Sequence, residues 1–316
     1  MQPLAGLLVV DLTRYLPGPF ATRELLRLGA RVVRLEAPGG DPLRELAPAW
    51  DTALNAGKES VCCDLKADPE LGRALCVRAD VVLESFRPGV ADRLGVGPGD
   101  LPDTVVYCSL TGFGPDDLRA GHDLNYQGYA GLLHDTAPAM PPVQVADLAA
   151  GALTAATEVL AALLERERTG RGVHLTLSLT HGAHKLVAHR LTGDPLPRLL
   201  TGGLACYRIY ETADGRYLTV GALEPRFFDR LCELLGRPEL SGRQWEADQE
   251  ALAGEIASAI AARPLTTWVE LFEGEDVSAG PVATIEEAAS AYGEPPPTEA
   301  AALGEHTEAW RAELGL

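Results

Sequence analysis

The sequence predicts an α/β protein with an open, doubly wound (Rossmann-like) parallel-sheet large domain and a smaller α+β domain. Two observations predict this class. Up to about residue 180, short continuous apolar runs alternate with segments of helical spacing, which is typical of parallel strands covered on both faces. After residue 200, a hairpin signal is followed by helical segments. The length of 316 residues also fits two domains of roughly 150 residues each.

The first part of the chain contains six apolar runs that predict buried strands. They lie at residues 6–12, 31–36, 60–65, 80–86, 104–111 and 172–179. Helical spacing predicts a helix over 20–28 that Gly29 ends, and another over 68–79 that Asp68 caps. A longer Ala-rich helix over 147–168 is apolar on most sides until its last turn, so we expect it to be buried deep in the molecule.

The second part of the chain begins with a hairpin. Strands at 206–211 and 216–221 flank Ala213-Asp214-Gly215, a turn signal. Helical segments follow near 225–235, 249–262 and 265–273. Residues 295–297, three prolines, predict a linker before a helical tail at 298–314. We therefore expect a large domain over 1–185, completed by 290–316, and a small domain over 200–289.

Composition excludes several classes of protein. The net charge of −18 argues against a nucleic-acid binder, although the first 66 residues are neutral in balance and are the better place for an anionic ligand. We expect neither a membrane span, because no apolar run reaches about 18 residues, nor a signal peptide, and hence a cytoplasmic protein. The six cysteines form no zinc spacing, which predicts free thiols and no metal.

Three places carry residues able to do chemistry. Gly121 to Tyr126 (GHDLNY) follows a predicted strand, where α/β sheets place ligands, although the same residues can simply satisfy a turn. Asp147 begins the long helix, where it can cap the helix and lie beside free N–H groups that hold an oxyanion. Glu224 precedes Pro225 at another helix start, where an acid is favoured by the helix dipole alone. A G-x-G-x-x-G fingerprint is absent, so NAD and FAD are not indicated.

A collinear set of segments matches the motifs of one protein family. These segments are PLAGLLVVDL at 3–12, PGPFAT at 17–22, LGARVVRLEAP at 28–38, GKESVCCDLK at 57–66, ADVVLESFRPGVADRLGVGP at 79–98, YCSLTGFGP at 107–115, AGHDLNY at 120–126, VADLAAG at 145–151, ERERTGRG at 165–172, YETADGRYLTVGALEPRFF at 210–228 and DVSAGPVATIEEA at 276–288. The chain resembles the family III CoA-transferase (CaiB/BaiF) superfamily and, within it, the α-methylacyl-CoA racemase branch.

The resemblance implies roles for individual residues. His122 and Asp147 would be the two proton-transfer residues, and Glu224 would be hydrogen-bonded to His122. The supporting residues of the same loop would be Asp123, Asn125 and Tyr126. Coenzyme A would lie over the large domain, on Lys58, Lys66, Arg87 and Gly121. Racemases of this branch carry an arginine where this chain has Ala37. The resemblance also implies an interlocked homodimer, with the site shared between the large domain of one subunit and the small domain of the other.

Three functions remain open at this point. The first is an acyl-CoA racemase or epimerase that inverts the α-carbon of a 2-methylacyl-CoA-type thioester by two-base 1,1-proton transfer through an enolate. The second is a CoA transferase that forms an acyl anhydride on Asp147, and the third is a non-catalytic acyl-CoA-binding homologue. None needs a cofactor beyond coenzyme A itself. The chain is shorter than typical family members, and its sequence does not specify the acyl group.

Overall fold

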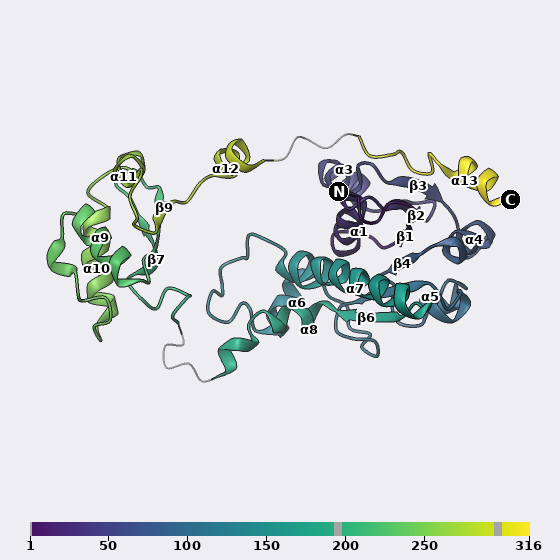
Figure 1. Cartoon of the computed structure of the whole chain (residues 1–316), viewed down its shortest axis with the longest axis horizontal. Helices are drawn as coiled ribbons and strands as arrows, with labels where there is room; N and C mark the ends of the chain where they lie inside the picture. Colours follow the sequence, from purple (N-terminus) through teal and green to yellow (C-terminus); the bar gives the residue numbers. More distant parts are fainter. Residues whose placement is uncertain (1, 193–197, 294–298) are drawn as a thin grey trace. The chain divides into compact units, whose positions relative to one another are not determined.

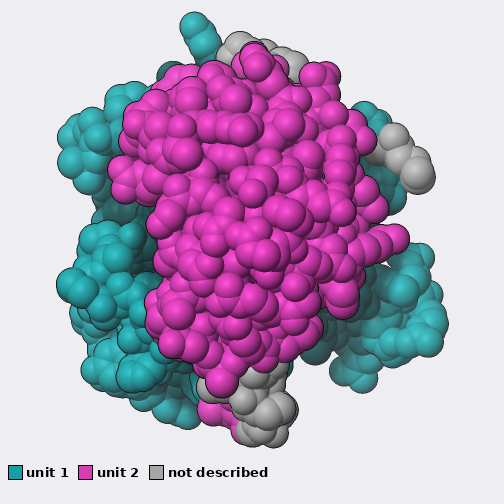
Figure 2. Space-filling model, turned by 90° about the vertical axis from the view of Figure 1, so that its left-hand side faces the viewer, with its two compact units in different colours: residues 1–189, 296–316 teal, residues 190–295 magenta. Residues whose placement is uncertain are grey.

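The computed structural model describes residues 2–192, 198–293 and 299–316, and the chain forms two compact units. Unit 1 comprises residues 1–189 together with 296–316, and unit 2 comprises residues 190–295 (Figure 2). The predicted division, 1–185 with 290–316 against 200–289, is similar. The prolines at 295–297, predicted as a linker, lie outside the described residues.

Unit 1 is built on a six-stranded parallel sheet. Its strands are β1 (Leu8–Leu12), β2 (Arg31–Glu36), β3 (Glu59–Cys62), β4 (Val81–Glu84), β5 (Val106–Thr111) and β6 (His174–Ser178). Their order is β3-β2-β1-β4-β5-β6, so the two halves of the sheet diverge from β1 and β4. The predicted doubly wound sheet is therefore confirmed. Such sheets bind ligands beyond the carboxyl ends of their strands, at this switch point.

One face of the sheet is covered by α1 (Pro17–Arg27) and α7 (Thr154–Thr169) (Figure 1). Pro17 suits the first turn of a helix because its φ is already fixed near the helical value. Gly29, with a φ of +102°, reverses the chain just after α1, as the sequence predicts. The buried contact is aliphatic and includes Val9, Ala21, Leu25, Val32, Val81, Val106 and Val159.

The opposite face is covered by α4 (Glu70–Arg78), α5 (Val90–Arg93) and the C-terminal helix α13 (Thr307–Leu314). The helical tail is thus shorter than predicted. Asp68 does not cap α4, because Pro69 occupies the cap position and the Asp68 carboxylate instead pairs with Arg311 of α13 at 3.0 Å. This ion pair helps to hold the C-terminal helix against the rest of unit 1.

The predicted long helix consists of two different segments. Its first two turns form a π-helix, η2 (Ala146–Leu153), and α7 continues it. The segment is only partly buried, with Leu153 and Leu164 exposed, so the prediction of deep burial on most sides is wrong. Ala146–Thr169 is also long and apolar enough to cross a membrane by length and composition, and half of it is buried inside the unit.

The remaining short helices of unit 1 lie in the loops between strands and after β6. They are α2 (Leu43–Leu46), α3 (Pro48–Asn55), α6 (Asp123–Ala130), α8 (Leu179–Lys185) and the 3₁₀ turn η1 (Pro98–Asp100). A further 3₁₀ turn, η3 (Ala188–Thr192), spans the boundary between the residues of unit 1 and those of unit 2. α6, α8 and η2 enclose a small apolar cluster of their own, which includes Phe113, Tyr126, Ala150 and Leu179. This cluster fixes α6 beside η2, so the two predicted reactive segments are packed together.

Unit 2 is an α+β unit, as predicted. Its antiparallel sheet has the order β7-β8-β9, from β7 (Tyr207–Glu211), β8 (Tyr217–Gly221) and β9 (Ala279–Pro281). The predicted hairpin is confirmed, whereas β9 was not predicted. Its helices are α9 (Pro225–Leu234), η4 (Pro238–Leu240), α10 (Gln249–Ile260), α11 (Leu265–Phe272) and α12 (Ile285–Tyr292).

All six cysteines are free thiols, as predicted, and five of them are buried. Burial raises the pKa of the Cys76 and Cys108 thiols to about 12. Because the thiolate is the reactive form of cysteine, these two residues are inert parts of the core. Among the described residues, no group of three or more His, Cys, Asp or Glu side chains is placed to hold a metal ion.

Candidate active site

A pocket of about 670 Å³ lies at the switch point of the sheet, beyond the carboxyl ends of β1, β4 and β5. Its volume is in the range of small-molecule sites. We call it the switch-point pocket. Its polar lining residues include Arg14, Tyr15, Arg87, Asp117, Arg119, His122, Asn125, Tyr126 and Asp147. The structure therefore brings His122 and Asp147, the two predicted proton-transfer residues, to one pocket.

His122 is the N-cap residue of α6. Its backbone N–H donates to the side-chain oxygen of Asn125 at 3.0 Å, and its carbonyl accepts from the backbone N–H of Asn125 at 2.8 Å. This reciprocal cap fixes the backbone of His122. Its ring nitrogens form no hydrogen bond with any described residue, so the imidazole is available to accept or donate a proton in the pocket.

Asp147 lies in the first turn of η2 and is half-buried. Burial, and then the negative charge of nearby Asp123, raise the pKa of its carboxyl to about 7. A carboxyl that titrates near neutrality is suited to take up a proton in one step and release it in the next. The structure thus gives Asp147 the protonation behaviour that proton transfer needs.

Asp123 lies behind the pocket and does not line it. It is buried, and one carboxylate oxygen accepts the backbone N–H of Asp147 at 2.9 Å while the other accepts the amide of Gln127 at 2.5 Å. The N–H of Asp147 is therefore already bonded, and that of Leu148 donates to the Gln144 carbonyl. This corrects the expectation that the N–H groups beside Asp147 hold an oxyanion.

A second correction concerns the place of Asp147 in its helix. The cap residue is Val145, so Asp147 is the second helical residue and not the cap. The sequence could not show that the helix begins at Ala146, because neither Val145 nor Ala146 has a side chain that can cap a helix. The carboxylate of Asp147 is thereby left unengaged by capping and lines the switch-point pocket.

Gly121 and Tyr126 close one wall of the pocket. The phenol of Tyr126 donates to the Gly121 carbonyl at 2.5 Å, and its ring packs edge-on against Phe113. A Cβ atom on Gly121 would lie 2.7 Å from the Tyr126 ring, so only glycine fits this wall. The predicted contact of Gly121 with coenzyme A stays a prediction.

Two cations of the pocket carry no partner in the part of the chain that the structure describes. Arg87 follows β4, as predicted, and Arg14 follows β1. Sequence reasoning missed Arg14, although its place at the end of the first strand was a usable signal. Arg14 also lines a neighbouring pocket of about 420 Å³, together with Ala37 and the predicted residue Lys66. These free cations stand out in a chain of net charge −18.

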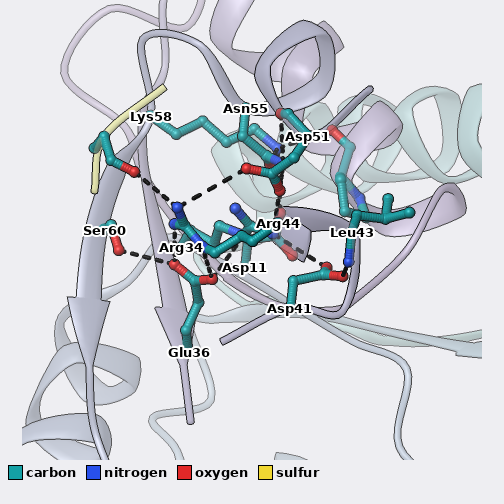
Figure 3. A network of polar contacts seen from close by, with 12 residues as sticks. Asp11, Arg34, Glu36, Asp41, Leu43, Arg44, Asp51, Asn55, Lys58 and Ser60 are labelled. Carbon is teal, nitrogen blue, oxygen red and sulfur yellow. Dashed lines mark hydrogen bonds and ion pairs between the residues drawn. The ribbon is translucent and has the colours of Figure 1, made fainter. Parts of the chain in front are cut away.

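Lys58 has an internal role, which corrects its predicted contact with coenzyme A. Its ammonium is buried and donates to the Pro19 carbonyl at 2.8 Å, to Thr22 at 2.7 Å and to Asn55 at 2.9 Å, beside the Asp11 carboxylate at 3.4 Å (Figure 3). An ammonium has three donors, so none is left for a phosphate.

Glu224 belongs to unit 2, where it is the N-cap residue of α9 and is exposed. Its predicted hydrogen bond to His122 joins the two units and stays a prediction. Pro225, the first residue of α9, fixes the helix start directly after Glu224, so the carboxylate is presented from a rigid backbone.

Comparison with known proteins places the chain in a family. A model of CoA-transferase family III matches residues 4–293. The chain belongs to CoA-transferase family III. Human α-methylacyl-CoA racemase is 35% identical over 308 residues, which cover 90% of this chain and 78% of that protein. Mouse succinyl-CoA:glutarate CoA-transferase is 31% identical over 323 residues, which cover 91% and 73%.

A solved structure of this family also matches the fold. The hypothetical protein Rv3272 of Mycobacterium tuberculosis superposes with a TM-score of 0.85 at 29% sequence identity, over 98% of this chain and 99% of that one. The resemblance inferred from the motifs is therefore confirmed. Family III members are enzymes, either racemases or CoA-transferases, and an acyl-CoA substrate is consistent with both.

Proposed function

We propose that the protein is an acyl-CoA racemase or epimerase that inverts the α-carbon of a 2-methylacyl-CoA-type thioester. The observation that carries this proposal is that His122 and Asp147 line one pocket. Inversion at carbon needs a base on one face and an acid on the other, each within hydrogen-bond reach of the same carbon. An imidazole and a carboxyl with a pKa of about 7 are suited to both tasks. Similarity to human α-methylacyl-CoA racemase supports the same reading.

The proton balance of the reaction is simple. The basic member of the pair, an ionised Asp147 or a neutral His122, takes the α-proton, and the electron pair of the broken C–H bond moves onto the thioester oxygen as an enolate. The protonated member then gives its proton to the opposite face of the same carbon. The two residues exchange roles for the other enantiomer, and the product differs from the substrate only in configuration.

The free cations explain where coenzyme A would bind. Arg14 lies at the junction of the switch-point pocket and the neighbouring pocket, since it lines both. Phosphates bind guanidinium and ammonium groups, so Arg14, Arg87 and Lys66 would hold the phosphates while the thioester reaches His122. Arg14 would supply the cation that Ala37 does not.

The experiment is α-proton exchange in D2O. Incubation with one enantiomer of a 2-methylacyl-CoA should give the racemic thioester, with one deuterium at the α-carbon by mass spectrometry. His122→Ala and Asp147→Asn should each abolish inversion. If no chiral 2-methylacyl-CoA exchanges its α-proton, the proposal fails.

A CoA transferase is the second candidate, because Asp147 presents a carboxylate to the pocket and transferases are among the relatives. In that reaction the Asp147 carboxylate attacks the thioester carbon, the C–S bond breaks and coenzyme A leaves as the thiolate. Hydroxylamine would then trap an acyl group on Asp147, and coenzyme A would pass to a free carboxylate without α-deuteration. Binding of acyl-CoA with neither reaction would indicate a non-catalytic homologue.

A further inference from the structure

Tyr15 is the aromatic neighbour of His122 in the switch-point pocket. Its ring meets the imidazole edge-to-face, with 6.2 Å between ring centroids and an angle of 86° between the planes. Within the described residues this is the only ring contact of His122, and the ring nitrogens have no hydrogen bond. His122 is exposed and its side chain can turn about its bond to the backbone, so the contact with Tyr15 favours one orientation of the imidazole in unit 1.

The backbone of Tyr15 is in the left-handed region, with a φ of +65°. Only one other non-glycine residue of the described chain, Ser278, has a positive φ. A bulky residue in this conformation is strained, and it persists only where the surroundings enforce it. Such strain is found mostly at functional sites, and Tyr15 lies in the pocket that holds His122 and Asp147.

A buried carboxylate enforces the conformation of Tyr15. One oxygen of Asp41 accepts the backbone N–H of Tyr15 at 2.9 Å, and the other accepts the N–H of Leu43 at 2.9 Å. The Asp41 side chain is 1% exposed and pairs with the guanidinium of Arg34 at 3.1 Å. Asp41 therefore ties the loop after β1 to the loop after β2, with no freedom of its own.

Asp41 is one member of a larger buried network (Figure 3). Arg34, on β2, also pairs with Asp51 at 2.8 Å and lies 3.5 Å from Glu36, which in turn binds Arg44 at 2.6 Å. Burying charges has a high desolvation cost, so a buried ion pair is weak evidence of stability. Its role here is geometric, because the network fixes Asp41 and, through Asp41, the backbone N–H of Tyr15.

The turn is fixed on its other sides as well. Asp11 accepts the N–H of Thr13 at 3.0 Å and its hydroxyl at 2.5 Å. A Cβ atom on Gly18 would lie 1.9 Å from the Thr13 hydroxyl oxygen, so the start of α1 packs directly on Thr13. The backbone of Tyr15 thus sits between two constrained positions, which fixes where its 40% exposed side chain enters the pocket.

We propose that Tyr15 is a positioning residue for His122: the buried Arg34–Asp41 pair holds Tyr15 in a left-handed conformation, and its ring fixes the imidazole for proton transfer. The proposal rests on the proposed function for the role of His122, but not for the contact itself. The ring face and edge do the positioning, so the phenol hydroxyl is dispensable. An alternative role, direct substrate binding by Tyr15, would alter KM and not kcat.

The kinetic experiment compares three substitutions in the full chain, with α-proton exchange of a chiral 2-methylacyl-CoA as the readout. Tyr15→Phe keeps the ring and should keep kcat within about twofold. Tyr15→Leu should lower kcat by about 10- to 100-fold with little change in KM, since small misplacement of a reacting group has effects of that size. Tyr129→Leu removes an exposed aromatic residue that does not contact His122, and should change neither. A normal kcat in Tyr15→Leu, or a change confined to KM, would overturn the proposal.

Tyr15→Gly and Tyr15→Ala separate positioning from folding. Both remove the ring, but glycine adopts a positive φ without strain. The glycine variant should therefore melt no lower than the alanine variant, yet lose as much kcat as Tyr15→Leu. If kcat followed the melting temperature across these variants, Tyr15 would be a structural residue only.

An NMR measurement on the free protein tests the contact without substrate. The ring protons of His122, assigned by their absence in His122→Ala, should keep their shifts in Tyr15→Phe and should move and broaden in Tyr15→Leu as the imidazole becomes mobile. Unchanged His122 signals in Tyr15→Leu would overturn the proposal. A wild-type protein without exchange activity would overturn the proposed function instead, so the two failures are distinct.

Discussion

Asp123 accepts a hydrogen bond from the backbone N–H of Asp147 at 2.9 Å. This bond joins the start of α6 to the first turn of η2. The buried carboxylate of Asp123, which accepts two hydrogen bonds, therefore lies behind the half-buried carboxyl of Asp147 that lines the pocket. Burial is the main cause of the raised pKa of Asp147, and the charge of Asp123 adds to it. Asp123 thus holds the backbone of Asp147 in place, while the Asp147 carboxyl faces the pocket.

Asp123→Asn should lower the pKa of Asp147. The asparagine oxygen can still accept the N–H of Asp147, but the negative charge that raises the pKa is gone. The acidic limb of the kcat/KM profile for α-proton exchange should therefore move to lower pH by about 1 unit. Asp117→Asn is the matched control, because Asp117 also lines the pocket but is paired with Arg119. Identical profiles for wild type and Asp123→Asn would show that the Asp123 charge does not reach Asp147.

Asp147→Asn should stabilise the fold while it abolishes inversion. The pKa of Asp147 is raised from 3.8 to about 7 in the folded protein, so the folded state binds this proton more tightly than the unfolded state does. The free energy of unfolding therefore falls as the pH rises from about 4 through about 7. Each pKa unit corresponds to about 1.4 kcal/mol, and the expected gain is about 2 to 4 kcal/mol at pH 8. Urea unfolding should show that gain at pH 8 and little of it at pH 4. Equal stability of the two proteins at pH 8 would contradict the assignment.

Two lysines predicted to share one role should behave differently. Lys58→Met leaves the Asp11 carboxylate, which is fully buried, without its cation, so the free energy of unfolding should fall by about 3 to 5 kcal/mol. Lys66→Met, at an exposed position of the neighbouring pocket, should change stability by less than about 0.5 kcal/mol and should weaken the binding of coenzyme A. Urea unfolding and calorimetric titration with coenzyme A measure the two effects. Comparable destabilisation by both variants would contradict the internal role of Lys58.

Arg14→Gln and Arg87→Gln should each raise the Kd for coenzyme A by about 10-fold, the size expected for one lost charge-assisted hydrogen bond. The dependence of Kd on salt should become shallower, because one cation fewer faces the phosphates. Arg93→Gln, which alters a cation outside both pockets, should bind as the wild type does. A salt dependence that is unchanged in the Arg14 variant would exclude Arg14 from the phosphate site.

Hydrophobic pattern was enough to predict the sheet. Strands buried on both faces have continuous apolar sequences, and each of the six runs in the first part overlaps a strand of the sheet. The run at 60–65 is displaced from β3, which begins at Glu59. The same pattern could not place η2 correctly, because its first residue, Ala146, lies before the polar residue that marks a capped helix start. Asp147 was therefore predicted as a cap and is found one position inside the helix.

Whether a polar residue is buried, and which conformation its backbone adopts, depends on partners far away in the chain. Lys58 is buried because Asp11, 47 positions earlier, and Thr22 on α1 converge on its ammonium. The left-handed conformation of Tyr15 depends on Asp41, 26 positions later. Nothing local in the sequence distinguishes Lys58 from Lys66 or marks the backbone of Tyr15, since both features arise from packing of separate strands and loops.

Trp310 should prove to be the main anchor of the C-terminal segment. It is 1% exposed, its indole N–H donates to Glu59 at 2.6 Å, and the guanidinium of Arg31 lies 4.1 Å from its ring centroid. Trp310→Ala should lower the free energy of unfolding by about 3 to 5 kcal/mol, as large-to-small changes in a core do. Trp310→Phe keeps most of the packing and loses only the hydrogen bond, so its cost should be about 1 to 2 kcal/mol.

The effect of Trp310→Ala on β3 distinguishes loss of the C-terminal anchor from a general loss of core packing. The backbone N–H groups of Ser60 and Cys62 on this edge strand donate to His306 and Thr307 of the same C-terminal segment. When Trp310→Ala releases the segment, those groups become free to pair with another chain. Hydrogen exchange should therefore accelerate selectively at β3, and aggregation should increase at temperatures below the melting transition. Leu25→Ala, a core change under α1, should destabilise the fold without selective exchange at β3, and uniform acceleration in both variants would contradict the anchoring role.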